Sequence, residues 1–263
     1  MNVWIDGRFV ASTELPPMRP GSFAPFETMG AREGVVPLWD LHLARLAATA
    51  PYLGLAFPSA SVGDAELRGA AFELLARNDH ADDVVRLSLQ GGDTAPQLVL
   101  ESRARGPHGV VRLVPTVVER GPGDPDRRHK LAPRRFYDAV RQQAQDAGAD
   151  DGLVVAADGA ILETSVANLW LRVDGIWVTP PLDGRILPGI ARGVLLQQAA
   201  AHGVPVAERA VGFADLHRAD ALAVSNAVHG PRAATLLGAS ANAEVVAREL
   251  APLWTAGVAA AAR

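Results

Sequence analysis

Apolar and polar residues alternate between residues 151 and 181 in the pattern of short antiparallel strands. Four apolar runs occur there, at residues 153–156, 161–163, 168–173 and 176–179. The turn dipeptides Asp158-Gly159 and Asp174-Gly175 separate two pairs of them, and Asp-Gly between apolar runs is typical of a β-hairpin. The stretch therefore predicts a β-meander.

The N-terminal part of the chain combines strands with two helices. Its expected strands cover residues 3–10 as a hairpin, 26–32, 35–38, 83–90 and 97–101, and its expected helices cover 42–55 and 65–77. Beyond it, the pattern predicts strands at 110–118, 204–211 and 221–225, helices at 136–148, 190–202, 213–218 and 243–263, and loops at 119–128 and 226–232. The prediction is an α+β protein with a small domain at 1–104, a Gly- and Pro-containing linker at 105–109 and a larger domain at 110–263.

Glu163 interrupts the apolar pattern of the meander, since it follows Leu162 and precedes another apolar segment. Burial of a carboxylate costs free energy unless a partner compensates it. Two interpretations are open. Glu163 is either a buried carboxylate with a function or a glutamate on the solvent side of a half-buried strand, which is the ordinary situation for this residue type.

The composition is that of an ordinary globular protein, with 263 residues, 49% hydrophobic and 21% charged residues, and a net charge of −4. Basic residues form no large block, which argues against a nucleic-acid surface. Cysteine is absent, which excludes disulfides, thiolate metal sites and a thiol nucleophile, and we expect no metal. No apolar stretch approaches the roughly 18 residues of a membrane span, and the N-terminus lacks the pattern of a signal peptide. We therefore expect a cytoplasmic protein without membrane association.

Lys130 is the only lysine of the chain, and the other 24 of its 25 Lys and Arg residues are arginines. Arginine replaces lysine where only a positive charge is needed, but it neither deprotonates nor forms a Schiff base. A lysine retained against this background indicates amine chemistry, although a chance survival is the alternative.

Pro188 and Gly189 precede the helix expected at 190–202. Free backbone N–H groups at a helix N-terminus can bind a phosphate, and glycine permits a close approach. An ordinary loop-to-helix turn has the same pattern, since every helix has such an end. The chain contains neither a P-loop motif nor a G-x-G-x-x-G dinucleotide motif.

In order along the chain, these features match the pattern of one family. The motif H-x-x-R-L stands at residues 42–46, the lone lysine at 130, an acidic-Gly-apolar run at 151–155, and a turn ending in Gly159. The motif E-x-x-x-x-N-apolar follows at 163–168, a D-G hairpin ending in T-P at 174–180, and apolar-L-P-G-I-x-R at 186–192. The chain resembles the class IV aminotransferases, the fold-type IV pyridoxal 5′-phosphate (PLP) enzymes. They include branched-chain and D-amino-acid aminotransferases and aminodeoxychorismate lyases.

The resemblance implies a two-domain fold-type IV architecture, with a small α/β domain and a larger β-barrel-like domain with flanking helices. It implies that Lys130 forms the Schiff base with PLP and carries the proton, and that Glu163 keeps the pyridine nitrogen protonated. Binding of the cofactor phosphate would fall to Arg45, the backbone amides of Ile190 and Ala191, and Asn226. The alternatives are a solvated helix charge for Arg45 and a plain loop-capping role for Asn226. It also implies a homodimer.

Local motifs favour a lyase within this family. The segments Ser225-Asn226-Ala227 and residues 163–170 (ETSVANLW) look more like aminodeoxychorismate lyases, which release pyruvate and 4-aminobenzoate. The alternative is an aminotransferase of the branched-chain or D-amino-acid type. In D-amino-acid aminotransferases the loop that corresponds to residues 91–95 carries an Arg that binds the substrate carboxylate; here it contains no Arg or His, which argues against that type. A further departure from the family pattern is Pro133, which stands where the family usually has Asn. Candidate residues facing a small amino substrate are Phe26, Arg134, Thr164, Arg185 and His229.

Overall fold

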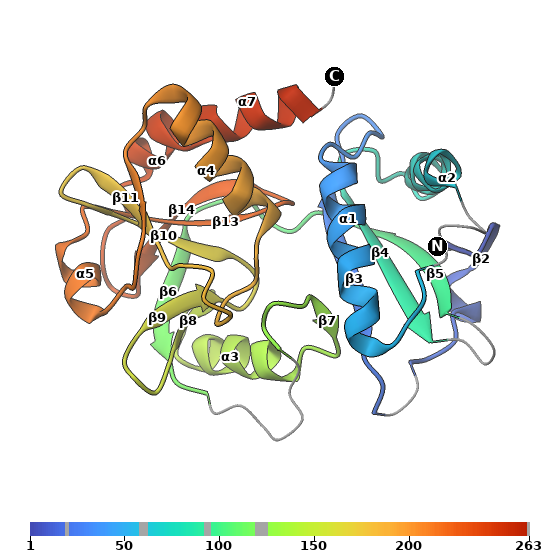
Figure 1. The fold of residues 1–263 in the computed structure, drawn as a ribbon, viewed down its shortest axis with the longest axis horizontal. Coiled ribbons are helices and arrows are strands. Elements are labelled where there is room, and N and C mark those ends of the chain that lie inside the picture. The colour runs from blue at the N-terminus through green and yellow to red at the C-terminus, as the bar shows by residue number, and fades with distance from the viewer. Residues whose placement is uncertain (19–20, 58–62, 92–95, 119–125, 262–263) are drawn as a thin grey trace. The chain divides into compact units, whose positions relative to one another are not determined.

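The computed structural model describes residues 1–18, 21–57, 63–91, 96–118 and 126–261 (Figure 1). The chain divides into two compact units. The first contains residues 1–106 together with 129–133, and the second contains residues 107–128 and 134–261. The segment around Lys130 thus packs with the first unit, whereas the domain expected at 110–263 had included it.

The first unit is built on a six-stranded sheet in the order β2-β1-β5-β4-β3-β7. Its strands are β1 (Asn2–Ile5), β2 (Arg8–Ala11), β3 (Ala24–Gly30), β4 (Val84–Gly91), β5 (Pro96–Arg103) and β7 (Leu131–Ala132). Its helices are α1 (Trp39–Thr49) and α2 (Asp64–Arg77), with short 3₁₀ helices η1 (Ser12–Glu14) and η2 (Ala50–Leu53). The predicted N-terminal hairpin is confirmed, with Trp4 opposite Phe9.

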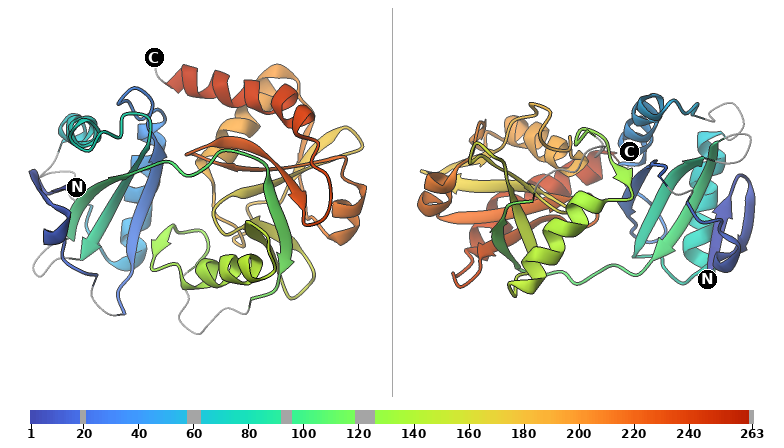
Figure 2. Two further views of the ribbon diagram at one scale, coloured as in Figure 1. Left: turned by 180° about the vertical axis from the view of Figure 1, so that it is seen from behind. Right: turned by 90° about the horizontal axis from the view of Figure 1, so that it is seen from below.

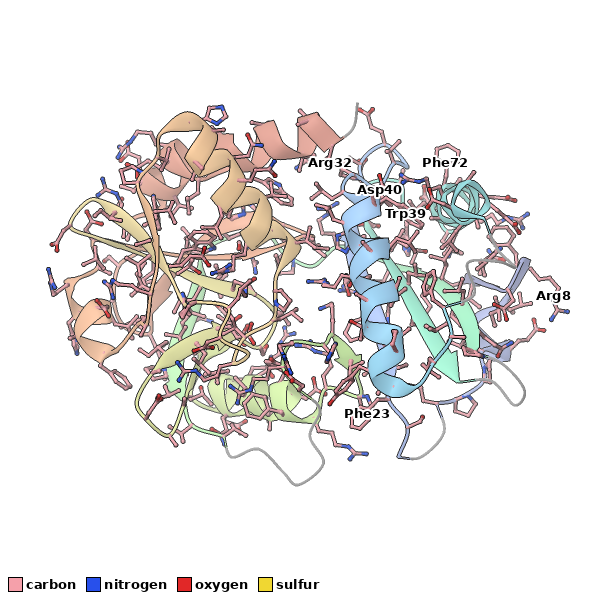
Figure 3. The ribbon with its side chains drawn as sticks, viewed as in Figure 1. Arg8, Phe23, Arg32, Trp39, Asp40 and Phe72 are labelled. Atoms are coloured by element: carbon pink, nitrogen blue, oxygen red, sulfur yellow. The ribbon has the colours of Figure 1, made fainter. Side chains whose placement is uncertain are left out.

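Both long helices of the first unit pack on one face of this sheet, because one apolar cluster joins them to it. Met29, Leu87 and Leu100 from the strands share that cluster with Leu46 of α1 and Leu74 of α2. Trp39, labelled in Figure 3 at the start of α1, also donates its indole N–H to Asp64 at 2.8 Å. The start of α1 is therefore fixed against the start of α2.

The second unit contains a closed ring of strands. Its sheet has the order β12-β11-β10-β13-β14-β6-β8-β9, and β9 also pairs with β10, so that six strands form a barrel (Figure 2). The bounds are β6 (Val111–Thr116), β8 (Asp151–Val155), β9 (Ile161–Thr164), β10 (Asn168–Val173), β11 (Ile176–Thr179), β12 (Val206–Glu208), β13 (Ala221–Asn226) and β14 (Gly230–Leu236). The pair that joins β9 to β10 is Glu163 opposite Asn168.

Helices surround the barrel, in agreement with the expected fold class. They are α3 (Arg135–Asp146), α4 (Ile190–His202), α5 (Phe213–Arg218), α6 (Ala243–Glu249) and α7 (Ala251–Ala261). Helix α3 packs closely on β8, where a Cβ on Gly152 would lie only 2.7 Å from Cγ1 of Val140. Among the described ranges, no helix is long and apolar enough to cross a bilayer.

Several predicted elements need correction. Residues 226–232 were expected to form a loop, but β14 begins at Gly230 and pairs along β13. One terminal helix was expected at 243–263, but α6 ends before α7 because Pro252 has no N–H to donate to the preceding turn. Residues 35–38 form only an isolated bridge, from Val35 to Arg32. Strand β12 is shorter than expected, and the two-residue strand β7 was missed.

Candidate active site

The backbone from Lys130 to Ala132 is tied to β3. Leu131 and Ala132 pair with Pro25 and Ala24, and the N–H of Phe26 donates to the carbonyl oxygen of Lys130 at 3.0 Å. The Lys130 Nζ lies over the Phe26 ring, 4.7 Å from its centroid, a favourable position for an ammonium group. The structure therefore brings Phe26, a predicted substrate-facing residue, together with the lysine.

Arg45 is held by a buried carboxylate on β3. Its Nε and Nη2 donate to Oε1 and Oε2 of Glu27 at 2.7 and 2.6 Å, a bidentate fork that fixes the guanidinium plane. The Nδ1 of His42 donates to Glu27 Oε2 at 2.7 Å. The alternative of a solvated helix charge is wrong for Arg45, because only 14% of its side chain is exposed.

The charges in this trio follow from burial and pairing. Burial acts to raise the pKa of Glu27, but the charge and hydrogen bonds of Arg45, aided by His42, outweigh it and lower the pKa to about 2. Burial lowers the pKa of His42, so His42 is neutral at pH 7 and donates its Nδ1–H. Glu27 and His42 were not predicted as site residues. The signal was a charged residue within the apolar strand 26–32.

Glu163 is buried in the second unit, with 3% of its surface exposed. The interpretation of a solvent-facing glutamate is therefore wrong. The Tyr137 hydroxyl donates to its Oε1 at 2.7 Å, and the Leu187 N–H lies 3.1 Å from its Oε2. Asn168, its partner across the barrel-closing pair, places Nδ2 3.4 Å from Oε2. These donors compensate the desolvation of the carboxylate.

Tyr137 was missed by the sequence analysis. It lies in the first turn of α3, and no spacing rule connects it with a strand 26 positions further along the chain. Burial, together with the adjacent Glu163 carboxylate, raises the pKa of Tyr137 well above its usual value. The phenol therefore keeps its proton at neutral pH and remains a donor.

Helix α4 begins where predicted, after Gly189. A Cβ on Gly189 would lie 1.8 Å from Oδ1 of Asn168, so the Asn168 side chain occupies the space that any larger residue needs. Asn168 also donates to the carbonyl of Leu187 at 3.0 Å. Ile190 and Ala191 are the first two residues of α4, and N–H groups at this position have no partner within the helix. Phosphate binding by these amides stays a prediction.

Asn226 ends β13 and caps the turn that follows. Its Oδ1 accepts from the N–H groups of Val228 and His229 at 3.1 and 3.0 Å, which is the capping interaction of an Asx turn. Next to it, Ser225 Oγ accepts from the indole N–H of Trp170 at 2.9 Å. Both of these side chains are buried. The phosphate role of Asn226 remains a prediction.

The remaining candidates occupy different surroundings within the second unit. Arg134 donates to the carbonyl of Ser165 and lies over the Tyr137 ring, 5.2 Å from its centroid. The buried Thr164 Oγ1 accepts from the N–H of Ala167 at 3.1 Å. Arg134 thus lies just before α3, the helix that carries Tyr137, and Thr164 directly follows Glu163 in β9. Arg185 instead forms ion pairs with Asp158 and Asp183 at 2.9 and 2.7 Å.

His229, the last of these candidates, lies beside His108, with ring centroids 5.7 Å apart. The sequence analysis also named the loop at 91–95, which has no Arg or His for a substrate carboxylate, and the loop at 119–128, which precedes Lys130. Residues 92–95 and 119–125 lie outside the described residues.

The model of the amino-transferase class IV family matches residues 24–236. The chain belongs to this family. Family members depend on PLP, and the chain is accordingly a PLP-dependent enzyme of the lyase or transaminase kind. The predicted family and cofactor are confirmed.

Relatives of both reaction types occur in the class IV family. A putative branched-chain-amino-acid aminotransferase of Methanocaldococcus jannaschii is 27% identical over 221 residues, covering 76% of the chain and 73% of the relative. A putative aminodeoxychorismate lyase of Schizosaccharomyces pombe is 28% identical over 175 residues, covering 65% and 72%. A hypothetical aminotransferase from Mycobacterium tuberculosis, solved in a PLP-bound form, shares the fold with a TM-score of 0.80 and 22% identity, covering 99% of each chain.

Proposed function

We propose that this class IV enzyme is a lyase that acts through the amine of 4-amino-4-deoxychorismate and releases pyruvate and 4-aminobenzoate. The observation that carries the lyase assignment is the buried hydrogen bond between Trp170 and Ser225. The two lyase-like segments, residues 163–170 and 225–227, meet in this bond. It ties the strand that follows Glu163 to the strand that ends at Asn226.

The described residues fit PLP by their chemistry. The cofactor needs an amine for covalent attachment, a carboxylate at its pyridine nitrogen and donors for its phosphate. The chain has one lysine, Lys130, and a buried carboxylate at Glu163 that neutral donors hold. A guanidinium fixed in one plane at Arg45 and a helix N-terminus at Ile190 are suited to phosphate.

We assign the following roles to these residues. Lys130 would hold the cofactor covalently and move the substrate proton with its amine. Glu163 would keep the pyridine nitrogen protonated. Arg45 and the amides of Ile190 and Ala191 would hold the phosphate. When bound, PLP would supply an electron sink for the negative charge that develops next to the substrate amine.

One measurement tests the attachment of the cofactor. Incubation with PLP, reduction with borohydride and mass spectrometry should show a single adduct on Lys130. Because the chain has no second lysine, a side-chain adduct has one possible position, and peptide mapping separates it from the N-terminal amine. The variant Lys130→Arg keeps the charge and should lose the side-chain adduct. A wild-type protein without this adduct would refute the proposed function.

An aminotransferase is the second candidate, and the similarity to the branched-chain enzyme of M. jannaschii over 76% of the chain favours it. The two reactions differ in what happens to the amino group. An aminotransferase transfers the amino group to the cofactor and releases one 2-oxo acid for each active site when given an amino donor alone. A lyase releases pyruvate and 4-aminobenzoate repeatedly without an acceptor. Stoichiometric 2-oxo acid release in the presence of a simple amino acid would therefore refute the lyase.

The expected homodimer is also part of the proposal. Light scattering on the full-length protein measures it directly, and a monomeric mass at working concentration would contradict it.

A further inference from the structure

Glu163 and Tyr137 form a hydrogen bond inside the second unit. The distance from the Tyr137 hydroxyl to Oε1 is 2.7 Å, a normal length for a hydroxyl donor, whereas the N–H groups of Leu187 and Asn168 make longer contacts with the same carboxylate. Hydrogen bonds to an ionised acceptor are shorter and about twice as strong as those between neutral groups. In buried surroundings such a donor strongly favours the charged form of the carboxylate.

Packing fixes the Tyr137 ring, and therefore the position of its hydroxyl. The ring meets Phe136 edge-on at 5.2 Å and packs against a buried cluster that includes Val154, Leu162 and Ile186. The guanidinium of Arg134 lies over the same ring. The tyrosine is thus held by α3 and the barrel independently of the hydrogen bond it makes.

We propose that Tyr137 is a positioning residue, whose hydroxyl holds Glu163 as an ionised and fixed acceptor for the pyridine N–H of PLP. The inference rests on the proposed role of Glu163. It adds a residue that contributes to the reaction only through Glu163, and it explains why a phenol is buried beside a carboxylate at the start of α3.

The charged groups near the pair agree with this role. The positive charges of Arg127 and Arg134 act to lower the pKa of Tyr137. The negative charges of Asp138, Asp151 and Glu163 act to raise the pKa of Arg134. Cations near the pair favour an ionised Glu163, and the raised pKa of Tyr137, caused by burial and by Glu163, keeps the phenol protonated. Tyr137 therefore remains the hydrogen-bond donor to Glu163 throughout the neutral pH range.

A titration of the full chain without added PLP tests the pair itself. The chain has two tyrosines, so the variant Tyr52→Phe leaves Tyr137 as the sole phenol, and its ionisation is followed by the absorbance of phenolate. In this background Glu163→Gln should lower the pKa of Tyr137 by about one unit, because the nearby negative charge is lost. An unchanged pKa would show that the two groups are not coupled and would overturn the inference.

The second arm uses the protein with PLP attached. Tyr137→Phe keeps the ring and removes only the hydroxyl. The adduct on Lys130 should still form, while the pH midpoint of the absorbance change of bound PLP should rise by about one unit. Without the hydroxyl, Glu163 is less ionised and the pyridine nitrogen is less protonated. The ring then withdraws fewer electrons from the Schiff-base nitrogen at Lys130, and that nitrogen keeps its proton to higher pH.

The outcomes separate the two proposals. No adduct on Lys130 in the wild-type protein would refute the proposed function and this inference with it. An adduct together with an unchanged midpoint in Tyr137→Phe would overturn the inference alone. Circular dichroism and the urea midpoint of Tyr137→Phe provide the control for folding. A purely structural tyrosine would change these two measurements without changing the pH midpoint.

Discussion

The contact between Gly189 and Asn168 allows a sharp prediction about α4. In Gly189→Ala the new Cβ would lie 1.8 Å from Oδ1 and 3.0 Å from Cγ of Asn168, so the asparagine must move. The backbone of Gly189, with φ −70° and ψ 133°, suits alanine. The cost is therefore steric, and we expect overpacking of about 1–3 kcal/mol. The hydrogen bond from Asn168 to Leu187 would be lost or lengthened with it.

Gly193 in the same helix is the matched control. A Cβ there would meet nothing within 4 Å, and the residue is exposed in the helix interior. Gly193→Ala should therefore stabilise the protein by about 0.5–1 kcal/mol, through its higher helix propensity. The two single-alanine variants should thus shift stability in opposite directions, although both replace one glycine of α4 or its N-cap.

Urea unfolding, followed by circular dichroism, measures the difference. We expect a lower midpoint than wild type for Gly189→Ala and a higher one for Gly193→Ala, at similar slopes. Equal midpoints for the two variants would refute the reasoning, since they would show that the Asn168 side chain moves away at no cost. Cofactor binding should weaken only in Gly189→Ala, because Asn168 also contacts Glu163.

Three further predictions concern other parts of the chain. The pKa of Glu27 is lowered to about 2 in the folded state, so its contribution to stability is complete above pH 4.5 and is lost as the pH falls towards 2. The urea midpoints of wild type and Glu27→Gln, compared from pH 7 to 3, should therefore approach each other on acidification. A constant difference between the two midpoints would contradict this. Ser225→Ala leaves the buried indole N–H of Trp170 without its acceptor and should cost about 1–3 kcal/mol in the free energy of unfolding, whereas Thr255→Ala, on the exposed side of α7, should cost much less. Arg45→Lys loses the bidentate fork and should weaken PLP binding at least tenfold while leaving pyridoxal, which has no phosphate, nearly unaffected; equal losses for both ligands would exclude a phosphate role.

Periodicity predicted most elements because their apolar faces are long enough to repeat. Helix α4 begins and ends where expected, and the Asp-Gly turn at Asp174-Gly175 joins β10 to β11. Strand β14 was missed because Gly230 and Pro231 at its start look like a turn. Strand β7 has two residues, too few for any period to appear, although it determines the unit to which Lys130 belongs.

The candidate residues were predicted through motifs, whereas their hydrogen-bond partners were not. Arg45 and Glu163 stand in recognisable segments, but Glu27 and Tyr137 contact them across long separations in sequence. Such contacts depend on which strand and helix meet in the fold. A single sequence contains no rule for that choice, although a charged residue inside an apolar strand, as at Glu27, marks a position that needs a partner.

The pair that closes the barrel also limits how Glu163 can be studied. Glu163 lies opposite Asn168 at the junction of β9 and β10. A ring of strands has no free edges, whereas an opened ring exposes two rows of unpaired backbone groups that can join other molecules. Substitutions that distort this junction are therefore expected to cause aggregation as well as loss of chemistry. Glu163→Gln, which preserves the size of the side chain and keeps one of its two acceptor oxygens, is the variant in which an effect on the reaction can be separated from opening of the barrel.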